Sequence, residues 1–354
     1  MKILHINYTL TYGGIETMLV NLANEQIKNG NEVYIIIFWN LVSPELISKL
    51  DKRINVIFIN RPQGSVNPIY LIRLNYYLKK LRPDVCHLHS AKLVDYIFLP
   101  SILRKCCVTQ HRECNGVGSD RLRKIKYRYA ISNTVKTSIS QTYNLQAYTI
   151  YNGIKPELFE YGKLKYSSKD NLFHIIQLGR LIHEEKGQHI LIDAIKILVQ
   201  LGYNNFLVDF VGDGPSLSFL QKLVKEKRIE GYVRFLGPKA QEYLYENLCK
   251  YDLLVQPSIY EGFGLTVIES MAAKVPVLVA NSKGPMEVIS NGKYGYYFET
   301  RNPEDLASKL QTIFDKGVGI NIVNRAFDVV YSVYNISNTA DLYIEEYSKF
   351  GKND

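Results

Sequence analysis

Residues 2–38, KILHINYTLTYGGIETMLVNLANEQIKNGNEVYIIIF, decide the fold of the first half of the chain. The apolar, β-branched run at 2–7 predicts a strand, and the polar segment after it ends at Gly13 and Gly14. Apolar residues at helical spacing then cover 15–28, where an Asn-Gly pair supplies a helix stop signal. A second apolar run follows, so this stretch predicts a strand, a glycine turn, a helix and a strand parallel to the first.

The same alternation continues to the end of the chain. Strand-like runs are separated by helix-length segments, which predicts two parallel sheets with helices on both faces. A polar stretch at 163–170 predicts a linker between them, and helical spacing of apolar residues at 333–349 predicts a terminal helix. Strands are expected at 32–38, 55–59, 84–88, 105–110 and 147–151, and again at 173–178, 206–211, 232–236, 252–256 and 275–280, with a helix at 68–81.

The length of 354 residues is that of two domains, which we expect at 1–155 and 156–332. With 46% hydrophobic and 22% charged residues, the composition is that of a globular protein and excludes a disordered chain. No apolar run reaches the ~18 residues of a membrane-spanning helix, and the first ten residues lack the sections of a signal peptide. We therefore expect a cytoplasmic protein whose ligand binds where the carboxyl ends of the two sheets face each other across a cleft.

The five cysteines are an odd number without the spacing of a disulfide framework, which favours free thiols in a reducing compartment. Cys106, Cys107, His111 and Cys114 lie close together in the sequence. Adjacent cysteines do not easily share a tetrahedral zinc ion, and no Cys-x-x-Cys pair completes such a site. We therefore expect no metal site.

The net charge of +9 is distributed unevenly. Residues 1–155 carry +12, whereas the rest of the chain carries −3. Such a basic half fits nucleic acid, anionic lipid or an acidic substrate, and it also fits a merely solvated face. The densest run places five cations in eight residues: Arg121, Arg123, Lys124, Lys126 and Arg128.

Two nucleotide-binding motifs are missing from the sequence. Neither GxGxxG nor GxxxxGK[ST] occurs, so a nicotinamide enzyme and a P-loop NTPase both lose their main support. The strongest local signal is 257–273, PSIYEGFGLTVIESMAA, in which a glycine loop joins a predicted strand to a helix that opens near Gly264. The unpaired amide groups of that helix form an anion site, and we expect Glu261 and Glu269 to bind neutral sugar hydroxyls beside it.

These two glutamates, separated by seven residues within EGFGLTVIESMA, resemble the signature of retaining glycosyltransferase family 4, the group 1 glycosyltransferases with a GT-B fold. The resemblance covers nearly the whole chain and implies two Rossmann-like, doubly wound α/β domains, with the terminal segment 333–354 packing back on the N-terminal domain. Six further segments resemble family elements in family order: GGIE at 13–16, QLGRL at 177–181, EKG at 185–187, FVGDGP at 210–215, VRFLG at 233–237 and GPMEV at 284–288.

The resemblance also implies roles for individual residues. Glu261 would contact the donor sugar and Glu269 the nucleotide ribose, while Arg180 and Lys186 would hold the diphosphate and stabilise it as it leaves. His111 would touch the donor sugar from the N-terminal domain. Further donor contacts are implied for Gly13, Gly14, Gly237, Gly262, Phe263, Gly264, Leu265 and Thr266. One departure is Pro285, which stands where many relatives carry a second glycine and removes an amide donor.

The function expected from the resemblance is that of a hexosyltransferase-type, retaining glycosyltransferase without a metal or another cofactor. It would move a sugar from a nucleoside diphosphate sugar, with a UDP-sugar favoured, to a hydroxyl of a glycan or lipid-linked glycan in bacterial surface polysaccharide synthesis. The departing diphosphate would take the acceptor proton, and the chain has no Asp-x-Asp triplet for a metal.

Three alternatives remain open from the sequence. A nucleotide-sugar epimerase of the same fold needs acid and base residues around the sugar, and a non-enzymatic, two-lobed ligand-binding protein needs export. Nucleic-acid binding lacks a known basic-aromatic motif. The basic half instead favours peripheral binding to the anionic inner face of the membrane, with the 121–128 run as the contact and Tyr127 and Tyr129 at the level of the lipid head groups.

Overall fold

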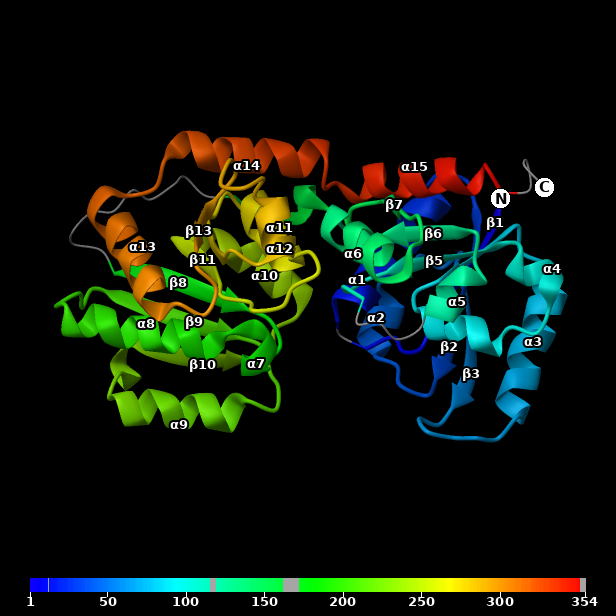
Figure 1. The fold of residues 1–354 in the computed structure, drawn as a ribbon, viewed down its shortest axis with the longest axis horizontal. Helices are drawn as coiled ribbons and strands as arrows, with labels where there is room; N and C mark the ends of the chain where they lie inside the picture. Colours follow the sequence, from blue (N-terminus) through cyan, green and yellow to red (C-terminus); the bar gives the residue numbers. More distant parts are fainter. Residues whose placement is uncertain (12, 115–118, 162–171, 351–354) are drawn as a thin grey trace. The chain divides into compact units, whose positions relative to one another are not determined.

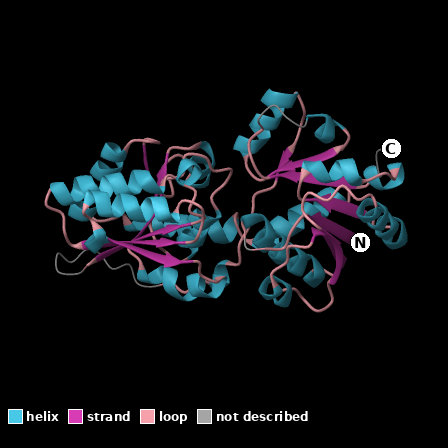
Figure 2. Cartoon of the chain, turned by 90° about the horizontal axis from the view of Figure 1, so that it is seen from below, coloured by secondary structure: helices cyan, strands magenta, loops and turns pink. Residues whose placement is uncertain are grey.

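The computed structural model describes residues 1–11, 13–114, 119–161 and 172–350. The chain forms two compact units, an N-terminal unit of Met1–Ile154 with Tyr334–Asp354 and a C-terminal unit of Lys155–Val333. Each unit has a sheet with helices packed against it (Figures 1 and 2). The linker predicted at 163–170 lies outside the described residues.

The N-terminal sheet has seven parallel strands in the order β3-β2-β1-β4-β5-β6-β7. The chain starts at the inner strand β1, winds outward to β3, returns to β4 beside β1 and continues in the other direction, so the sheet is doubly wound with its switch point between β1 and β4. The strands are β1 Lys2–Asn7, β2 Glu32–Trp39, β3 Asn55–Arg61, β4 Val85–Leu88, β5 Cys106–Gln110, β6 Tyr127–Ala130 and β7 Tyr148–Thr149.

Helices cover both faces of this sheet. Helices α1, α2 and α15 pack on one face, and α3, η1, α4 and α5 pack on the other. The last helix, α15, contacts α1 and buries Tyr343 and Tyr347, so the terminal segment completes the core of the N-terminal unit. The helices are α1 Gly14–Lys28, α2 Pro44–Ser48, α3 Ile69–Leu81, the 3₁₀ helix η1 Ala91–Tyr96, α4 Pro100–Leu103, α5 Ser119–Arg123, α6 Asn133–Tyr143 and α15 Ile336–Tyr347.

The C-terminal unit repeats the plan with six parallel strands in the order β10-β9-β8-β11-β12-β13. The switch point lies between β8 and β11, and α8, α9 and α13 cover one face. The strands are β8 Phe173–Leu178, β9 Phe206–Val211, β10 Val233–Gly237, β11 Leu253–Gln256, β12 Val277–Ala280 and β13 Tyr296–Phe298. The helices are η2 Pro156–Leu158, α7 His183–Lys186, α8 Gln188–Gln200, α9 Leu217–Lys227, η3 Glu230–Tyr232, α10 Gln241–Asn247, η4 Leu248–Lys250, α11 Leu265–Ala272, α12 Lys283–Val288, α13 Pro303–Lys316 and α14 Ile320–Ser332.

The prediction of two doubly wound α/β sheets is therefore confirmed, but the sequence analysis missed two short strands, β6 and β13, and several strand ends differ. The strand expected at 147–151 has only two residues in the sheet, Tyr148–Thr149, because it pairs with β6 alone at the sheet edge. Over the described residues, the structure contains no helix with the length and apolarity needed to cross a membrane.

Candidate functional site

The switch point of the C-terminal sheet carries an ion pair. Lys186, the last residue of α7, lies in the connection after β8, and Glu261 lies in the loop after β11. The Nζ atom of Lys186 is 2.6 Å from Oε2 of Glu261, and the two side chains are 20% and 19% exposed. Because β8 and β11 are the strands that flank the switch point, this pair occupies the place where doubly wound sheets bind their ligands.

Two glycines bring the surrounding loops close to this pair. Gly187 has φ +66, and a side chain there would overlap the carbonyl oxygen of Pro257. A side chain at Gly284 in α12 would overlap the carbonyl oxygen of Glu261. The loop that carries Glu261 is thus held between two backbone segments, and only glycine permits either approach.

Gln256 fixes the position of Glu261, and sequence reasoning missed it. This buried residue ends β11, and its Nε2 donates to Oε2 of Glu261 at 3.3 Å and to Oγ of Ser258 at 3.0 Å. The hydroxyl of Thr266, in the first turn of α11, donates to Oε1 of Gln256 at 3.1 Å. The sequence marks Gln256 only as a polar residue at the end of an apolar strand and does not indicate these contacts.

Arg180 lies just beyond the end of β8. Its backbone carbonyl accepts a hydrogen bond from Nε2 of Gln188 at 2.9 Å, which holds the loop against the start of α8. The side chain is exposed, and no ion pair of its guanidinium occurs among the described residues. The guanidinium can therefore bind an anionic ligand without losing a carboxylate partner.

Glu269 lies in the second turn of α11 and is buried. Its Oε1 accepts a hydrogen bond from Nε2 of Gln241 at 2.8 Å. Burial raises the pKa of Glu269 to about 7, although the hydrogen bond from Gln241 acts in the opposite direction. Gln241 is a second residue that the sequence did not indicate, because its contact with Glu269 joins α10 to α11.

The other predicted donor-binding residues of this unit lie along the same loops. Gly264 has φ +111 and precedes α11, with Leu265 and Thr266 partly exposed in its first turn. Phe263 is buried in the core, so only its backbone can reach a ligand. The remaining two are Gly262, which is partly exposed, and Gly237, which ends β10 with φ +69.

Pro285 does not disturb its helix. It lies in the first turn of α12, where backbone N–H groups have no partner within the helix. Both Pro285 and the preceding Gly284 are buried. Proline in place of glycine at position 285 therefore removes an amide donor but does not break a hydrogen bond within α12.

In the N-terminal unit, Gly13 and Gly14 begin α1. Gly13 is in extended conformation at the N-cap, and Oε1 of Glu16 accepts a hydrogen bond from the Thr9 hydroxyl at 2.6 Å. The other carboxylate oxygen of Glu16 lies 2.5 Å from where a side chain at Gly13 would begin. Glu16 thus occupies the positive end of α1, so an anion that binds at this end must displace it.

His111 follows β5 directly. Its Nε2 atom is buried and has no hydrogen-bond partner among the described residues. Burial and, to a smaller extent, the neighbouring Arg112 lower the pKa of His111 to about 4. At neutral pH His111 is therefore an uncharged imidazole that has one ring nitrogen still to satisfy.

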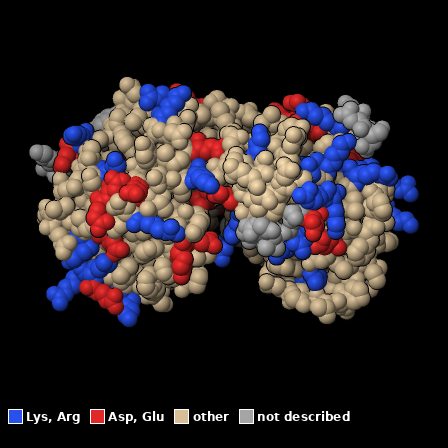
Figure 3. Space-filling view, viewed as in Figure 1, with Lys and Arg blue, Asp and Glu red and all other residues tan. Residues whose placement is uncertain are grey.

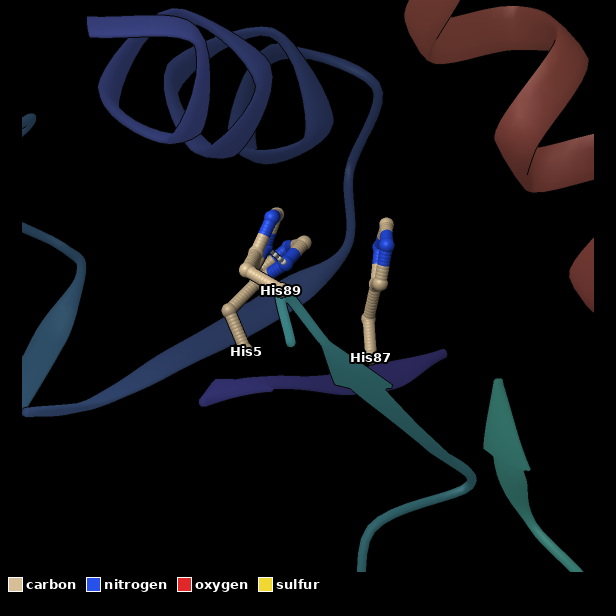
Figure 4. A group of neighbouring side chains, drawn as sticks. All are labelled: His5, His87 and His89. Atoms are coloured by element: carbon tan, nitrogen blue, oxygen red, sulfur yellow. Dashed lines mark hydrogen bonds between the residues drawn. The ribbon is translucent and has the colours of Figure 1, made fainter. Parts of the chain in front are cut away.

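Beside His111 lies a cluster of three buried histidines, His5, His87 and His89 (Figure 4). His5 and His87 are register partners on β1 and β4, and Nδ1 of His5 is 3.1 Å from Nε2 of His89. Burial is the main cause that lowers the pKa of each, to about 4 for His5 and well below the ordinary value for the other two. All three are therefore neutral at neutral pH.

The same cluster is the group of described side chains with the spacing to hold a metal ion, because its ring nitrogens lie within 4.8 Å of one another. Both nitrogens of His87 are already hydrogen-bonded, to Oγ1 of Thr109 at 2.7 Å and to the hydroxyl of Tyr347 at 2.6 Å. A metal ion would have to break these bonds. In this structure the cluster instead links the sheet to α15.

The cations of the 121–128 run are largely occupied within the protein. Arg121 and Lys124 form ion pairs with Asp95, and Arg123 donates to the carbonyl of Tyr143. The expectation that Tyr129 lies at the level of the lipid head groups is wrong, because this residue is on β6 and is fully buried. Tyr127 is half-buried and stacks on Phe350 with the ring centroids 3.7 Å apart.

Comparison with known proteins gives the same assignment for both halves of the chain. The model of the glycosyl transferases group 1 matches residues 163–322, and that of glycosyltransferase family 4 matches residues 12–158. An uncharacterized glycosyltransferase of Methanocaldococcus jannaschii is 26% identical over 95% of this chain and 94% of its own length. N-acetyl-alpha-D-glucosaminyl L-malate synthase of Bacillus anthracis is 29% identical over 56% of this chain and 53% of its own.

The architecture of the chain also matches a solved structure. Anabaena HepE, solved in complex with UDP and glucose, superposes with a TM-score of 0.81 at 20% identity, over 99% of this chain and all of that one. Two doubly wound parallel sheets with this likeness define the GT-B fold. The chain belongs to the group 1 glycosyltransferases, with an N-terminal half of the family 4 type.

Proposed function

We propose that this glycosyltransferase transfers a sugar from a UDP-sugar, with retention of configuration, to a hydroxyl of a glycan or lipid-linked glycan in bacterial surface polysaccharide synthesis. The observation that carries the proposal is the Lys186–Glu261 pair at the switch point, where a cation for phosphate and an acceptor for sugar hydroxyls lie side by side. The complex of Anabaena HepE with UDP and glucose, and the sugar named in the synthase from Bacillus anthracis, support this class of donor.

The reaction follows from the chemistry of these side chains. The bond between the sugar C1 and the diphosphate oxygen breaks, the acceptor oxygen bonds to C1 on the same face, and the acceptor proton passes to the departing diphosphate. Lys186 and Arg180 stabilise the negative charge that grows on the diphosphate. Glu261 orients the sugar hydroxyls, Glu269 binds the ribose, and the neutral His111 binds the sugar through its unsatisfied Nε2.

We propose further that catalysis needs no divalent ion, because two cations and the amide groups at the start of α11 supply the positive charge. The experiment is a screen of nucleoside diphosphate sugars for slow hydrolysis without acceptor, with and without EDTA. We expect hydrolysis of one UDP-sugar at an unchanged rate in EDTA. Loss of activity in EDTA with recovery in magnesium would refute metal independence, and no hydrolysis of any donor would refute the transferase assignment.

Nucleoside binding is expected to depend on pH through Glu269. Its pKa of about 7 means that the carboxyl is mainly protonated at pH 6 and ionised at pH 8. Because only the ionised form offers acceptors to both ribose hydroxyls, affinity should rise by up to about tenfold over this range. Uridine is the ligand to use in calorimetry, since it carries no phosphate that titrates.

The matched control for this titration is Glu269→Gln, which keeps the shape of the side chain and has no titrating proton. We expect weak uridine binding by this variant, with the same affinity at pH 6 and pH 8. A wild-type affinity that is flat with pH would contradict the role of Glu269 at the ribose.

For localisation we propose a cytoplasmic enzyme that binds peripherally to the anionic inner face of the membrane and does not bind nucleic acid. The charge of +12 on residues 1–155 supports an anionic surface as partner. An acceptor linked to a lipid would be present at that surface. In the 121–128 run Arg121 and Lys124 pair with Asp95 and Arg123 binds a carbonyl, although Arg123, Lys124 and Lys126 stay exposed, so a further contact surface in this unit is also considered.

A further inference from the structure

The outer face of α3 exposes an unusual number of large apolar side chains. Ile69, Ile72 and Tyr76 are 54%, 60% and 58% exposed, and Val66, just before the helix, is 94% exposed. Phe98 is 59% exposed and lies beside them, because its backbone N–H donates to Oδ1 of Asn75 in the middle of α3. We call these five exposed apolar residues the α3 strip.

The α3 strip is bordered by positive charge on both sides. At 100° per residue, Lys79 projects on one side of Ile72 and Tyr76, while Arg73 and Lys80 project on the other, and all three cations are exposed. Residues 62–83 contain four cations and no Asp or Glu. In Figure 3 the surface where α3 lies in Figure 1 is mostly tan, with blue Lys and Arg side chains at its upper end.

Helix α3 is therefore apolar on two opposite sides. Its inner side packs Leu74 and Leu78 into the core of the N-terminal unit. A surface helix ordinarily turns polar residues toward water, and a helix that is apolar all round is normally covered on all sides. The α3 strip thus indicates a second apolar environment, in addition to the protein core.

The charges select the partner. A second copy of this chain would place the same cations opposite one another, which opposes self-association through this face. An anionic bilayer instead offers acyl chains to the apolar side chains and negative head groups to the flanking cations. Tyr76 and Phe98 are aromatic side chains of the kind enriched at the boundary between these layers.

We propose that the α3 strip, with Arg73, Lys79 and Lys80, is the surface by which the N-terminal unit docks on an anionic membrane, with α3 lying in the plane of the head groups. This deepens the proposed peripheral association and assigns it to α3 instead of the 121–128 run. Residues 62–68 join the carboxyl end of β3 to the start of α3, so Val66 lies in the connection at the carboxyl-end edge of the N-terminal sheet.

The test is cosedimentation with vesicles of phosphatidylcholine alone and of phosphatidylcholine with phosphatidylglycerol. We expect wild type to bind only the anionic vesicles, and less as salt rises. The double variant Ile72→Ser/Tyr76→Ser and the double variant Lys79→Glu/Lys80→Glu should each bind at least about tenfold more weakly. Leu342→Ser is the control, because Leu342 is an exposed apolar residue (47%) on α15 of the same unit, and it should bind as wild type.

Donor hydrolysis tests the proposed function, and vesicle binding tests the role of the α3 strip, so the two proposals can fail separately. Hydrolysis of the UDP-sugar donor by the variants should equal that of wild type, since none of these residues belongs to the donor site. Wild-type binding by Ile72→Ser/Tyr76→Ser, or a loss confined to Lys124→Glu, would overturn the assignment to α3. A concentration-dependent dimer that the Ile72→Ser/Tyr76→Ser variant abolishes would overturn it in favour of a second copy of the chain.

Discussion

Glu261→Gln is expected to slow sugar transfer about ten- to a hundredfold and at the same time to tighten the binding of UDP. The loss follows because hydrogen bonds from the sugar hydroxyls to a charged carboxylate are worth about 1.5–3 kcal/mol. The gain follows because Glu261 neutralises Lys186 in the free protein, with Nζ and Oε2 only 2.6 Å apart. Without that carboxylate, Lys186 is available to the phosphates, and UDP should bind at least about threefold more tightly.

Calorimetry with UDP and a transfer assay on the same preparations measure the two effects. Glu184→Gln is the control, because it removes a largely exposed carboxylate from α7, the short helix that carries Lys186. Lys186→Ala should have the opposite effect to Glu261→Gln: it should weaken the binding of UDP and leave the binding of uridine unchanged. If Glu261→Gln weakens UDP, the ion pair is not a competitor of the diphosphate and the glutamate has a different role.

Mild acid is expected to unfold the N-terminal unit while the C-terminal unit stays folded. His5, His87 and His89 have folded-state pKa values far below the 6.5 of an unfolded histidine, so the unfolded state binds more protons. Their contribution to stability is complete above about pH 6.5 and is lost as pH falls toward 4. At pH 5.5 the loss from His5 alone is about 1.4 kcal/mol, and His87 and His89 add to it in the same direction, against the 5–15 kcal/mol of a typical domain.

In the C-terminal unit two shifted groups oppose each other, because burial lowers the pKa of His189 and raises that of Glu269. Glu269 has a folded pKa of about 7, above its unfolded value, so its protonation favours the folded state as pH falls. The single tryptophan of the chain, Trp39, lies on β2 of the N-terminal unit, and its fluorescence therefore reports that unit alone. Circular dichroism measured in parallel should retain signal from the other unit near pH 5, and one shared transition for both probes would contradict the prediction.

The sequence was sufficient for the fold because alternating apolar runs and glycine turns act locally. Strand, turn and helix over residues 2–38 follow from spacing alone, and β1, α1 and β2 are found there. What it did not reveal depends on register and on tertiary packing. Gln256 and Gln241 matter only because β11, α10 and α11 come together, and no local pattern indicates those contacts.

The sequence also did not show which side chains of a strand or helix face solvent. Tyr129 looked exposed because it stands beside a basic run, but the alternation of a strand turns it into the core beneath α15. The sequence likewise contains α3 as an apolar helix without indicating which of its residues face solvent. Apolar residues on two sides of α3 give no single apolar face in the sequence. The density of cations at 121–128 therefore predicts the membrane contact there and not at α3.

The position of α15 has a consequence for biosynthesis. Residues 1–154 leave the ribosome first, yet the helix that supplies Tyr343 and Tyr347 to their core is translated last. At about 5–20 residues per second, roughly 10–40 s pass between these events, during which the C-terminal unit can fold completely. Until α15 is synthesised, the His87 and Thr109 side chains lack their hydrogen bonds to Tyr347 and Tyr343. The core of the N-terminal unit therefore stays incomplete on the nascent chain.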